Sequence, residues 1–445
     1  MLSGKTVAAC TLGCKTNQYE TDGMMEILKK MGASVVNFED TADVYLINTC
    51  SVTNMADKKS RQMIHRARKN NPEALVIACG CYVQAEKEKL SQDKDIDIII
   101  SNNRKKDIGH VIAEYFNSGE TACFTDISRE KEFEELDVNK PVYHTRAYVK
   151  IQDGCNQFCT YCIIPYVRGR IRSRSMDSVI DEISRLAEAG VKEVVLTGIH
   201  ISSYGRDMDG DTGLADLVEN ISKIEGIERI RLGSLEPGII TEEFAHRIKA
   251  VDKLCPHFHL SLQSGCDSVL KRMNRKYTCG EYMEKCELLR KVYKNPAITT
   301  DVIVGFPGET EEEFECTRKY LEDINLYEMH IFKYSRRKGT VADRMEGQVD
   351  EKIKTQRSAI LLELENKMSK EYRQQHIGKT EEVLIEEIVS ENGKDYFMGF
   401  TPDYIRVKIA CDTALDNSEY INTIKKVYMK ELSDDGIVVT GIFEC

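Results

Sequence analysis

Apolar and polar positions alternate with two different periods along residues 1–117. Short apolar runs bounded by glycine or polar residues are typical of buried strands, and longer segments with apolar residues three or four positions apart are typical of helices. Strands are predicted over 5–13, 42–50, 74–81 and 95–101, and helices over 17–32 and 54–72. Because strands alternate with helices, this region is predicted to form a parallel α/β domain, in which ligands bind at the carboxyl ends of the strands.

A second alternating region covers residues 141–372. Its strand-like segments are 147–159, 191–202, 227–237, 257–265, 297–310 and 328–335. About six strand–helix repeats can be counted, whereas a complete (β/α) barrel has eight. We therefore predict a partial (β/α)6 barrel with its pocket at the carboxyl ends of the strands.

The rest of the chain is predicted to form a linker and a third domain. Residues 118–140 are acidic and lack a clear period, which is typical of a linker. Residues 373–445 follow a long helical segment and contain about five short strand-like runs, which predict a small all-β barrel. The predicted fold class is therefore α/β in three domains, with the all-β barrel last.

The composition is that of an ordinary globular protein. The chain has 445 residues, of which 41% are hydrophobic and 30% are charged. No run approaches the roughly 18 apolar residues that a membrane span needs, and the N-terminus lacks the pattern of a secretory signal peptide. We therefore expect a cytoplasmic protein without a membrane partner.

Sixteen cysteines are many for such a protein. In a reducing compartment, clustered cysteines indicate metal binding or redox chemistry rather than disulfides. Cys14, Cys50 and Cys81 each follow a predicted strand and are 36 and 31 residues apart, one strand–helix unit in each case. Parallel strands bring such positions to one edge of the sheet, so we predict a three-cysteine site there. The alternative is that all three are buried core residues.

Three further cysteines, Cys155, Cys159 and Cys162, lie in one short loop with the spacing C-x3-C-x2-C. A cluster of four irons normally takes four cysteines, so three leave one iron with an open coordination position. S-adenosylmethionine carries the amine and carboxylate that can fill this position. A reduced cluster can then cleave the sulfonium and produce a carbon radical, a reaction that no side chain can perform.

The net charge of −11 is unevenly distributed. Arg168, Arg170, Arg172 and Arg174 follow the second cysteine group, and a second basic stretch, 57–69, has six Lys/Arg against one acidic residue. Because phosphate contacts dominate RNA affinity, the four arginines are the predicted RNA-binding residues. The alternative is a solvated helix face and loop. The C-terminal region has seven Lys/Arg against fourteen Asp/Glu, which is unfavourable for binding RNA.

Several segments resemble one enzyme family, the radical SAM methylthiotransferases. The family's three N-terminal cysteine motifs resemble 11–21, 47–56 and 79–86, its central signature resembles 154–175, and its later barrel motifs resemble 260–278 and 300–314. Residues 168–175 and 196–205 are most similar to the branch that modifies threonylcarbamoyladenosine in tRNA. Ser175 and Arg337 depart from that pattern, since proline is usual at both positions.

The resemblance implies two 4Fe–4S clusters and S-adenosylmethionine as cofactors. One cluster would be held by Cys155, Cys159 and Cys162, and the other by Cys14, Cys50 and Cys81. The substrate would be adenosine 37 in the tRNA anticodon loop, methylthiolated at C2 of its threonylcarbamoyl form, with a second S-adenosylmethionine supplying the methyl group. An electron donor such as flavodoxin or ferredoxin and a sulfur donor would be needed, and the last domain would be TRAM-like.

Four residues are predicted to contact S-adenosylmethionine. Tyr161 precedes the last loop cysteine, Glu236 follows a predicted strand, and Gly305 and Glu309 lie in a glycine-containing turn that permits close backbone approach to a ligand. For the last two, the alternative is an ordinary helix start.

Other functions remain open at this point. Within the family, the substrate alternatives are isopentenyladenosine in tRNA and a ribosomal protein. Outside it, the cysteines are compatible with an iron–sulfur electron carrier or a zinc-containing tRNA-binding protein.

Overall fold

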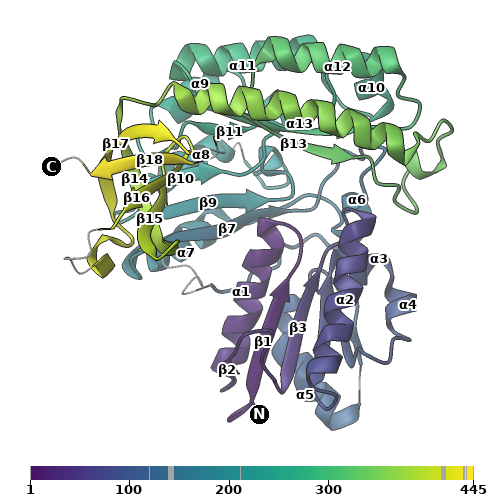
Figure 1. Ribbon diagram of the computed structural model, residues 1–445. Coiled ribbons are helices and arrows are strands. Elements are labelled where there is room, and N and C mark those ends of the chain that lie inside the picture. The colour runs from purple at the N-terminus through teal and green to yellow at the C-terminus, as the bar shows by residue number, and fades with distance from the viewer. Residues whose placement is uncertain are drawn as a thin grey trace.

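The computed structural model describes residues 2–119, 121–138, 145–210, 212–411, 417–433, 436 and 438–443. The N-terminal part is a parallel sheet in the order β2-β1-β3-β4-β5-β6 with helices on both faces (Figure 1). Its strands are β1 (Thr6–Thr11), β2 (Ser34–Val35), β3 (Val44–Thr49), β4 (Leu75–Gly80), β5 (Ile98–Ile100) and β6 (Ala122–Cys123). Its helices are α1 (Lys15–Lys30), α2 (Asn54–Asn70), α3 (Cys81–Ala85), α4 (Lys87–Leu90), η1 (Lys105–Asp107) and α5 (Ile108–Ser118).

The central strands of this sheet are apolar runs because both faces are covered. Every residue of β3 and of β4 is buried, as expected when helices pack on both faces of a parallel sheet. Separate hydrophobic clusters lie on the two faces. The predicted parallel α/β domain is confirmed.

The first sheet extends into the segment predicted as a linker. β6 pairs with β5, and Leu136 and Val138 are buried beside Tyr19 of α1. A two-residue strand has no detectable period, so the sequence pattern missed it. The predicted boundary between residues 140 and 141 lies outside the described residues.

The central part is an open barrel whose strands follow the order β8-β7-β9-β10 and then β11-β12-β13. Parallel bridges from Ile230 to Leu254 and from Leu235 to Leu260 connect the two sheets. Among the described residues of this part, only β8 is antiparallel, so six parallel strands remain and the predicted (β/α)6 pattern is confirmed. The strands are β7 (Arg146–Asp153), β8 (Arg172–Ser173), β9 (Glu193–Gly198), β10 (Arg229–Leu232), β11 (His257–His259), β12 (Ala297–Val304) and β13 (Glu328–Lys333).

Helices cover the outside of this barrel (Figure 1), and the largest hydrophobic cluster among the described residues lies in this part. Thr278 and Thr310 begin two of them with capping boxes, in which the threonine and a glutamate three residues later exchange hydrogen bonds. The helices are α6 (Ile164–Val167), α7 (Met176–Glu188), η2 (Ile201–Ser203), α8 (Leu214–Ile221), η3 (Pro237–Ile239), α9 (Glu242–Lys249), α10 (Asp267–Arg272), α11 (Cys279–Tyr293), α12 (Glu311–Ile324), η4 (Ala342–Arg344) and α13 (Glu351–Gln374).

The C-terminal part is a closed barrel in the order β14-β15-β16-β18-β17. It packs against the central domain, where the Arg229 and Arg231 guanidinium groups donate to barrel carbonyl oxygens. The predicted small all-β barrel is confirmed. Its elements are β14 (Thr380–Glu391), β15 (Lys394–Phe400), β16 (Arg406–Ala410), η5 (Asn417–Tyr420), β17 (Ile424–Leu432) and β18 (Val439–Phe443). Within the described ranges, no helix combines the length and apolar character needed to cross a membrane.

Candidate active site at the domain junction

A cavity of about 340 Å³ lies where the first two domains meet. Its wall includes Cys155, Cys159 and Cys162 from the loop after β7, and Val52 and Thr53 from the segment between β3 and α2. Residues that follow β9, β10 and β11, together with residues of β12 and residues at the end of β13, also line it, so the cavity occupies the carboxyl ends of the barrel strands, as predicted.

The loop with the three cysteines is hydrogen-bonded and closely packed against its surroundings. Gly154 has φ +70°, and a Cβ there would lie 1.8 Å from the Arg170 carbonyl oxygen, so only glycine fits. The Cys155 N–H donates to the Gly169 carbonyl oxygen (3.1 Å), and the Thr160 N–H donates to that of Met273 (3.0 Å). The cysteines therefore face the cavity from a rigid frame.

The environment of these thiols fits an iron–sulfur cluster. Burial raises the pKa of Cys155 to about 11 and of Cys162 to about 12, so binding iron must displace protons. The Arg275 guanidinium lies 3.4 Å from Cys159 Sγ and supplies a donor to a ligand sulfur.

Glu236, which follows β10, forms a hydrogen-bonded group in the cavity wall. Its Oε2 accepts from Gln157 Nε2 (2.5 Å) and lies 2.6 Å from His200 Nε2. Burial disfavours ionisation of Glu236, but the His200 hydrogen bond and the charge of Arg275 outweigh it and lower the pKa of Glu236. The cavity therefore contains a carboxylate suited to an amine or a ribose hydroxyl. Tyr161 also lines the cavity and packs edge-on against Phe306.

Gly305 and Glu309 lie outside the cavity wall, so the contact with S-adenosylmethionine stays a prediction. Glu309 Oε2 accepts from the Gly305 N–H (2.6 Å) and from Arg357 Nη1 (2.7 Å). The Lys354 side chain covers Gly305, since a Cβ there would lie 2.3 Å from Lys354 Cγ. This turn therefore anchors α13 to the barrel. Sequence reasoning instead missed Gln157, His200 and Arg275 of the cavity.

Cys14, Cys50 and Cys81 lie at the carboxyl ends of β1, β3 and β4. Cys14 caps α1, Cys50 directly follows β3, and Cys81 begins α3. Burial, together with the neighbouring Cys81 and Cys14, raises the pKa of Cys50 to about 12. Gly13 allows the backbone before Cys14 to lie close to Cys50, because a Cβ at position 13 would lie 2.9 Å from Cys50 Sγ. The structure therefore brings the three predicted strand-end cysteines together.

Arg337 connects this second cysteine group to the barrel. Its Nη2 donates to Ser51 Oγ (2.7 Å) and pairs with Asp57 Oδ2 (2.8 Å), and its Nη1 donates to Asn54 Oδ1 (2.9 Å). Ser51 is the residue after Cys50. Arg337, which stands where proline is usual, thus makes a contact between the two domains.

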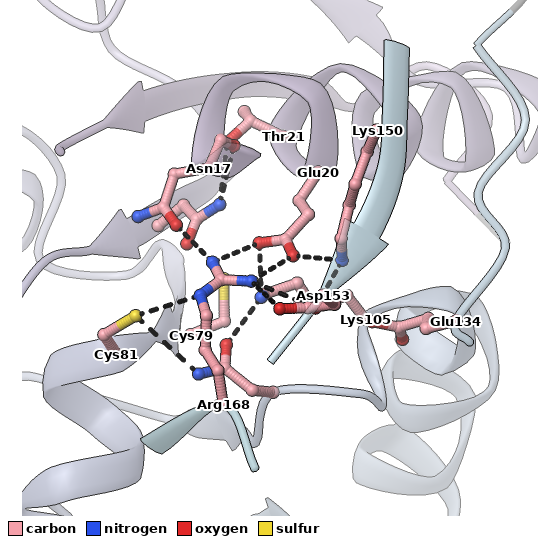
Figure 2. Close-up of polar contacts among 12 residues, drawn as sticks. Asn17, Glu20, Thr21, Cys79, Cys81, Lys105, Glu134, Lys150, Asp153 and Arg168 are labelled. Atoms are coloured by element: carbon pink, nitrogen blue, oxygen red, sulfur yellow. Dashed lines mark hydrogen bonds and ion pairs between the residues drawn. The ribbon is translucent and has the colours of Figure 1, made fainter. Parts of the chain in front are cut away.

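The structure corrects the RNA-binding prediction for three of the four arginines. The side chains of Arg168, Arg172 and Arg174 are 0%, 1% and 2% exposed. Arg168 pairs with Glu20 and Asp153, and Arg174 pairs with Glu182. Figure 2 shows Arg168 inside a polar network between the first two domains. Only Arg170 of this run is exposed.

Comparison with known proteins decides the family. Residues 149–321 match the Radical SAM superfamily, and residues 6–101 match Uncharacterized protein family UPF0004. The threonylcarbamoyladenosine tRNA methylthiotransferase MtaB of Bacillus subtilis (strain 168) is 43% identical over 405 residues, covering 90% of each chain. The chain belongs to the radical SAM tRNA methylthiotransferase family. This enzyme family uses S-adenosylmethionine and 4Fe–4S clusters, and the resemblance seen in the sequence is confirmed.

The relatives of this methylthiotransferase are named for two different substrates. The MtaB of Thermotoga maritima is 35% identical over 98% of this chain and 96% of its own. A tRNA-2-methylthio-N(6)-dimethylallyladenosine synthase of Finegoldia magna is also 35% identical, over 92% and 89%. The radical S-adenosylmethionine methyltransferase TsrM from Kitasatospora setae has the same fold, with a TM-score of 0.55 at 15% identity over 75% of this chain and 76% of its own.

Proposed function

We propose that the enzyme methylthiolates C2 of N6-threonylcarbamoyladenosine at position 37 of tRNA. The observation that supports this proposal best is the placement of two cysteine trios at one domain junction, beside a cavity that both domains line. One site can start the radical reaction, and the other can supply sulfur. The 43% identity to the Bacillus subtilis enzyme supports threonylcarbamoyladenosine as the substrate.

The roles of the residues follow from their positions. Cys155, Cys159 and Cys162 would hold the cluster that provides the electron for cleaving S-adenosylmethionine, and Cys14, Cys50 and Cys81 would hold the second cluster. Glu236, with His200, would bind the amine or ribose of S-adenosylmethionine. Overall, one adenine C–H bond is replaced by C–S–CH3, with sulfur from a donor and methyl from a second S-adenosylmethionine.

Other components follow from the reaction. The electron requires a donor of the flavodoxin or ferredoxin class, and the sulfur requires a separate donor. A tRNA substrate agrees with the expected cytoplasmic location.

The substrate is tested by mass spectrometry of reaction products. The protein is reconstituted anaerobically with iron and sulfide, then given S-adenosylmethionine, a reductant and tRNA carrying either threonylcarbamoyladenosine or dimethylallyladenosine. We expect the methylthio nucleoside from the first tRNA only. Product from the second tRNA alone would assign the enzyme to the other tRNA branch. Cleavage of S-adenosylmethionine without product from either tRNA would point to a protein substrate.

The exposed face of α2 is a better candidate for tRNA docking than the buried arginines. Lys58 and Lys59 are exposed, and the helix begins next to the cavity residues Val52 and Thr53. Charge reversal of both lysines should weaken tRNA binding. It should also reduce the slope of the logarithm of the binding constant against the logarithm of salt concentration by about two, because each phosphate contact contributes about one to that slope. The dissociation constant is measured at several salt concentrations.

Two lysines on other helices provide the control. Lys291 of α11 and Lys319 of α12 are also exposed, and reversing both makes the same change in net charge. If the two double variants weaken binding equally, α2 is not the docking surface.

A further inference from the structure

Arg168 occupies a buried position between the two cysteine groups. It lies six residues after Cys162 in the chain, and its Nε is 3.4 Å from Cys81 Sγ in the other domain. Its remaining donors are all used: Nη1 and Nη2 bind Glu20 at 2.8 and 3.0 Å, Nη1 also binds Asp153 at 3.1 Å, and Nη2 binds Asn17 Oδ1 at 2.6 Å. Figure 2 shows the guanidinium at the centre of these contacts.

The carboxylates around Arg168 are shared with two lysines. Lys105 Nζ lies 2.6 Å from Glu20 Oε2, and Lys150 Nζ lies 2.7 Å from Glu20 Oε1 and 2.6 Å from Asp153 Oδ2. All five side chains are at most 3% exposed. Fixed in this way, the guanidinium has no freedom to turn away from Cys81.

This network contains one more positive charge than negative charges. Three cations face two carboxylates, and adding the buried Arg172 and Glu134 as charged groups leaves the excess unchanged. An unpaired buried charge is costly. The Nε–H of Arg168 points to Cys81, and a cysteine that binds iron does so as a thiolate. The ligand sulfur is therefore the anion that completes the network.

A second side chain supports the same contact from the first domain. Asn102 Nδ2 lies 3.8 Å from Cys81 Sγ and donates to the Val167 carbonyl oxygen at 2.7 Å. Asn102 Oδ1 accepts from Lys105 Nζ at 2.6 Å. The Val167 carbonyl, directly before Arg168, is thus hydrogen-bonded to a side chain that also contacts Cys81.

We propose that Arg168 is a positioning residue that fixes Cys81 as a cluster ligand and raises the reduction potential of the cluster on Cys14, Cys50 and Cys81. This inference rests on the proposed function, because it requires that second cluster. Hydrogen bonds to ligand sulfurs and nearby positive charge favour the reduced, more negative state of an iron–sulfur cluster. Because Arg168 belongs to the segment that follows the other cysteine loop, it also connects the two sites mechanically.

The test uses the full-length chain with Cys155, Cys159 and Cys162 replaced by alanine, so that only the second cluster contributes to the spectrum. The midpoint potential is measured by titration followed by electron paramagnetic resonance. Arg168→Gln should make this cluster at least tenfold harder to reduce, about 59 mV for one electron. Arg168→Lys should give an intermediate shift, since it keeps the charge but lacks the Nε–H group.

Arg174→Gln is the matched control. Arg174 belongs to the same segment, is also buried, and also contacts α1 through Tyr19, but it pairs with Glu182 instead of approaching a cysteine. A loss of the cluster in Arg168→Gln but not in Arg174→Gln would also support the proposal. Equal potentials in the two variants would overturn it. Failure of the parent to bind any cluster would refute the two-cluster function itself, together with this inference.

Discussion

Replacing Cys14, Cys50 and Cys81 by alanine should leave a protein that binds about four irons and cleaves S-adenosylmethionine but forms no methylthio product. The backbone hydrogen bonds of the cysteine loop after β7 go to Gly169 and Met273, and none of the three replaced thiols lines the cavity. Replacing Cys155, Cys159 and Cys162 should also leave about four irons, but cleavage should disappear. Iron, 5′-deoxyadenosine and the modified nucleoside are measured in parallel.

A lone core cysteine supplies the control for these variants. Cys286 is fully buried in α11, far along the chain from both trios. Cys286→Ala should retain about eight irons and full product formation, with only a modest loss of stability. If the variant of Cys14, Cys50 and Cys81 kept about eight irons, the second cluster would have to be elsewhere. If it kept product formation, sulfur transfer would not need this site.

The positions of the cysteines were predictable because topology determines them. In a parallel sheet built from strand–helix units, the residues after successive strands meet at one edge. Cys14, Cys50 and Cys81 satisfy this rule with strand ends at Thr11, Thr49 and Gly80. The same argument placed the loop cysteines at the mouth of the barrel.

The burial of the arginines was not predictable from their own segment. A run of alternating arginines has the same pattern whether it faces solvent or a buried carboxylate. The deciding partner, Glu20, lies 148 positions earlier in the chain than Arg168. A signal exists in α1, however, where Asn17, Glu20 and Thr21 are buried although polar and have helical spacing. Polar residues on the buried face of a helix indicate a partner, but not which one.

Glu20 leads to the second prediction, which concerns stability. Glu20 is 0% exposed and accepts from three cations, Lys105, Lys150 and Arg168. Glu20→Gln removes the anion and leaves the cations with too little compensation, which should cost about 3–5 kcal/mol. The effect is measured as a lower midpoint urea concentration for the separation and unfolding of the first domain. Hydrogen exchange in α1 is the readout. Glu26→Gln, on the same helix in a pair with Lys29, should cost less than about 1 kcal/mol.

The pH dependence of this difference has a definite sign. Burial opposes ionisation of Glu20, but the three cations outweigh it and hold its pKa well below the usual range. A carboxyl group with a lowered pKa in the folded state stabilises that state fully above its unfolded pKa, about 4.3, and progressively less as the pH falls towards the folded value. The gap in stability between the natural protein and Glu20→Gln should therefore be constant near neutral pH and narrow below about pH 4. A gap that stayed constant down to pH 3, or widened, would show that the carboxylate does not hold the two domains together by charge.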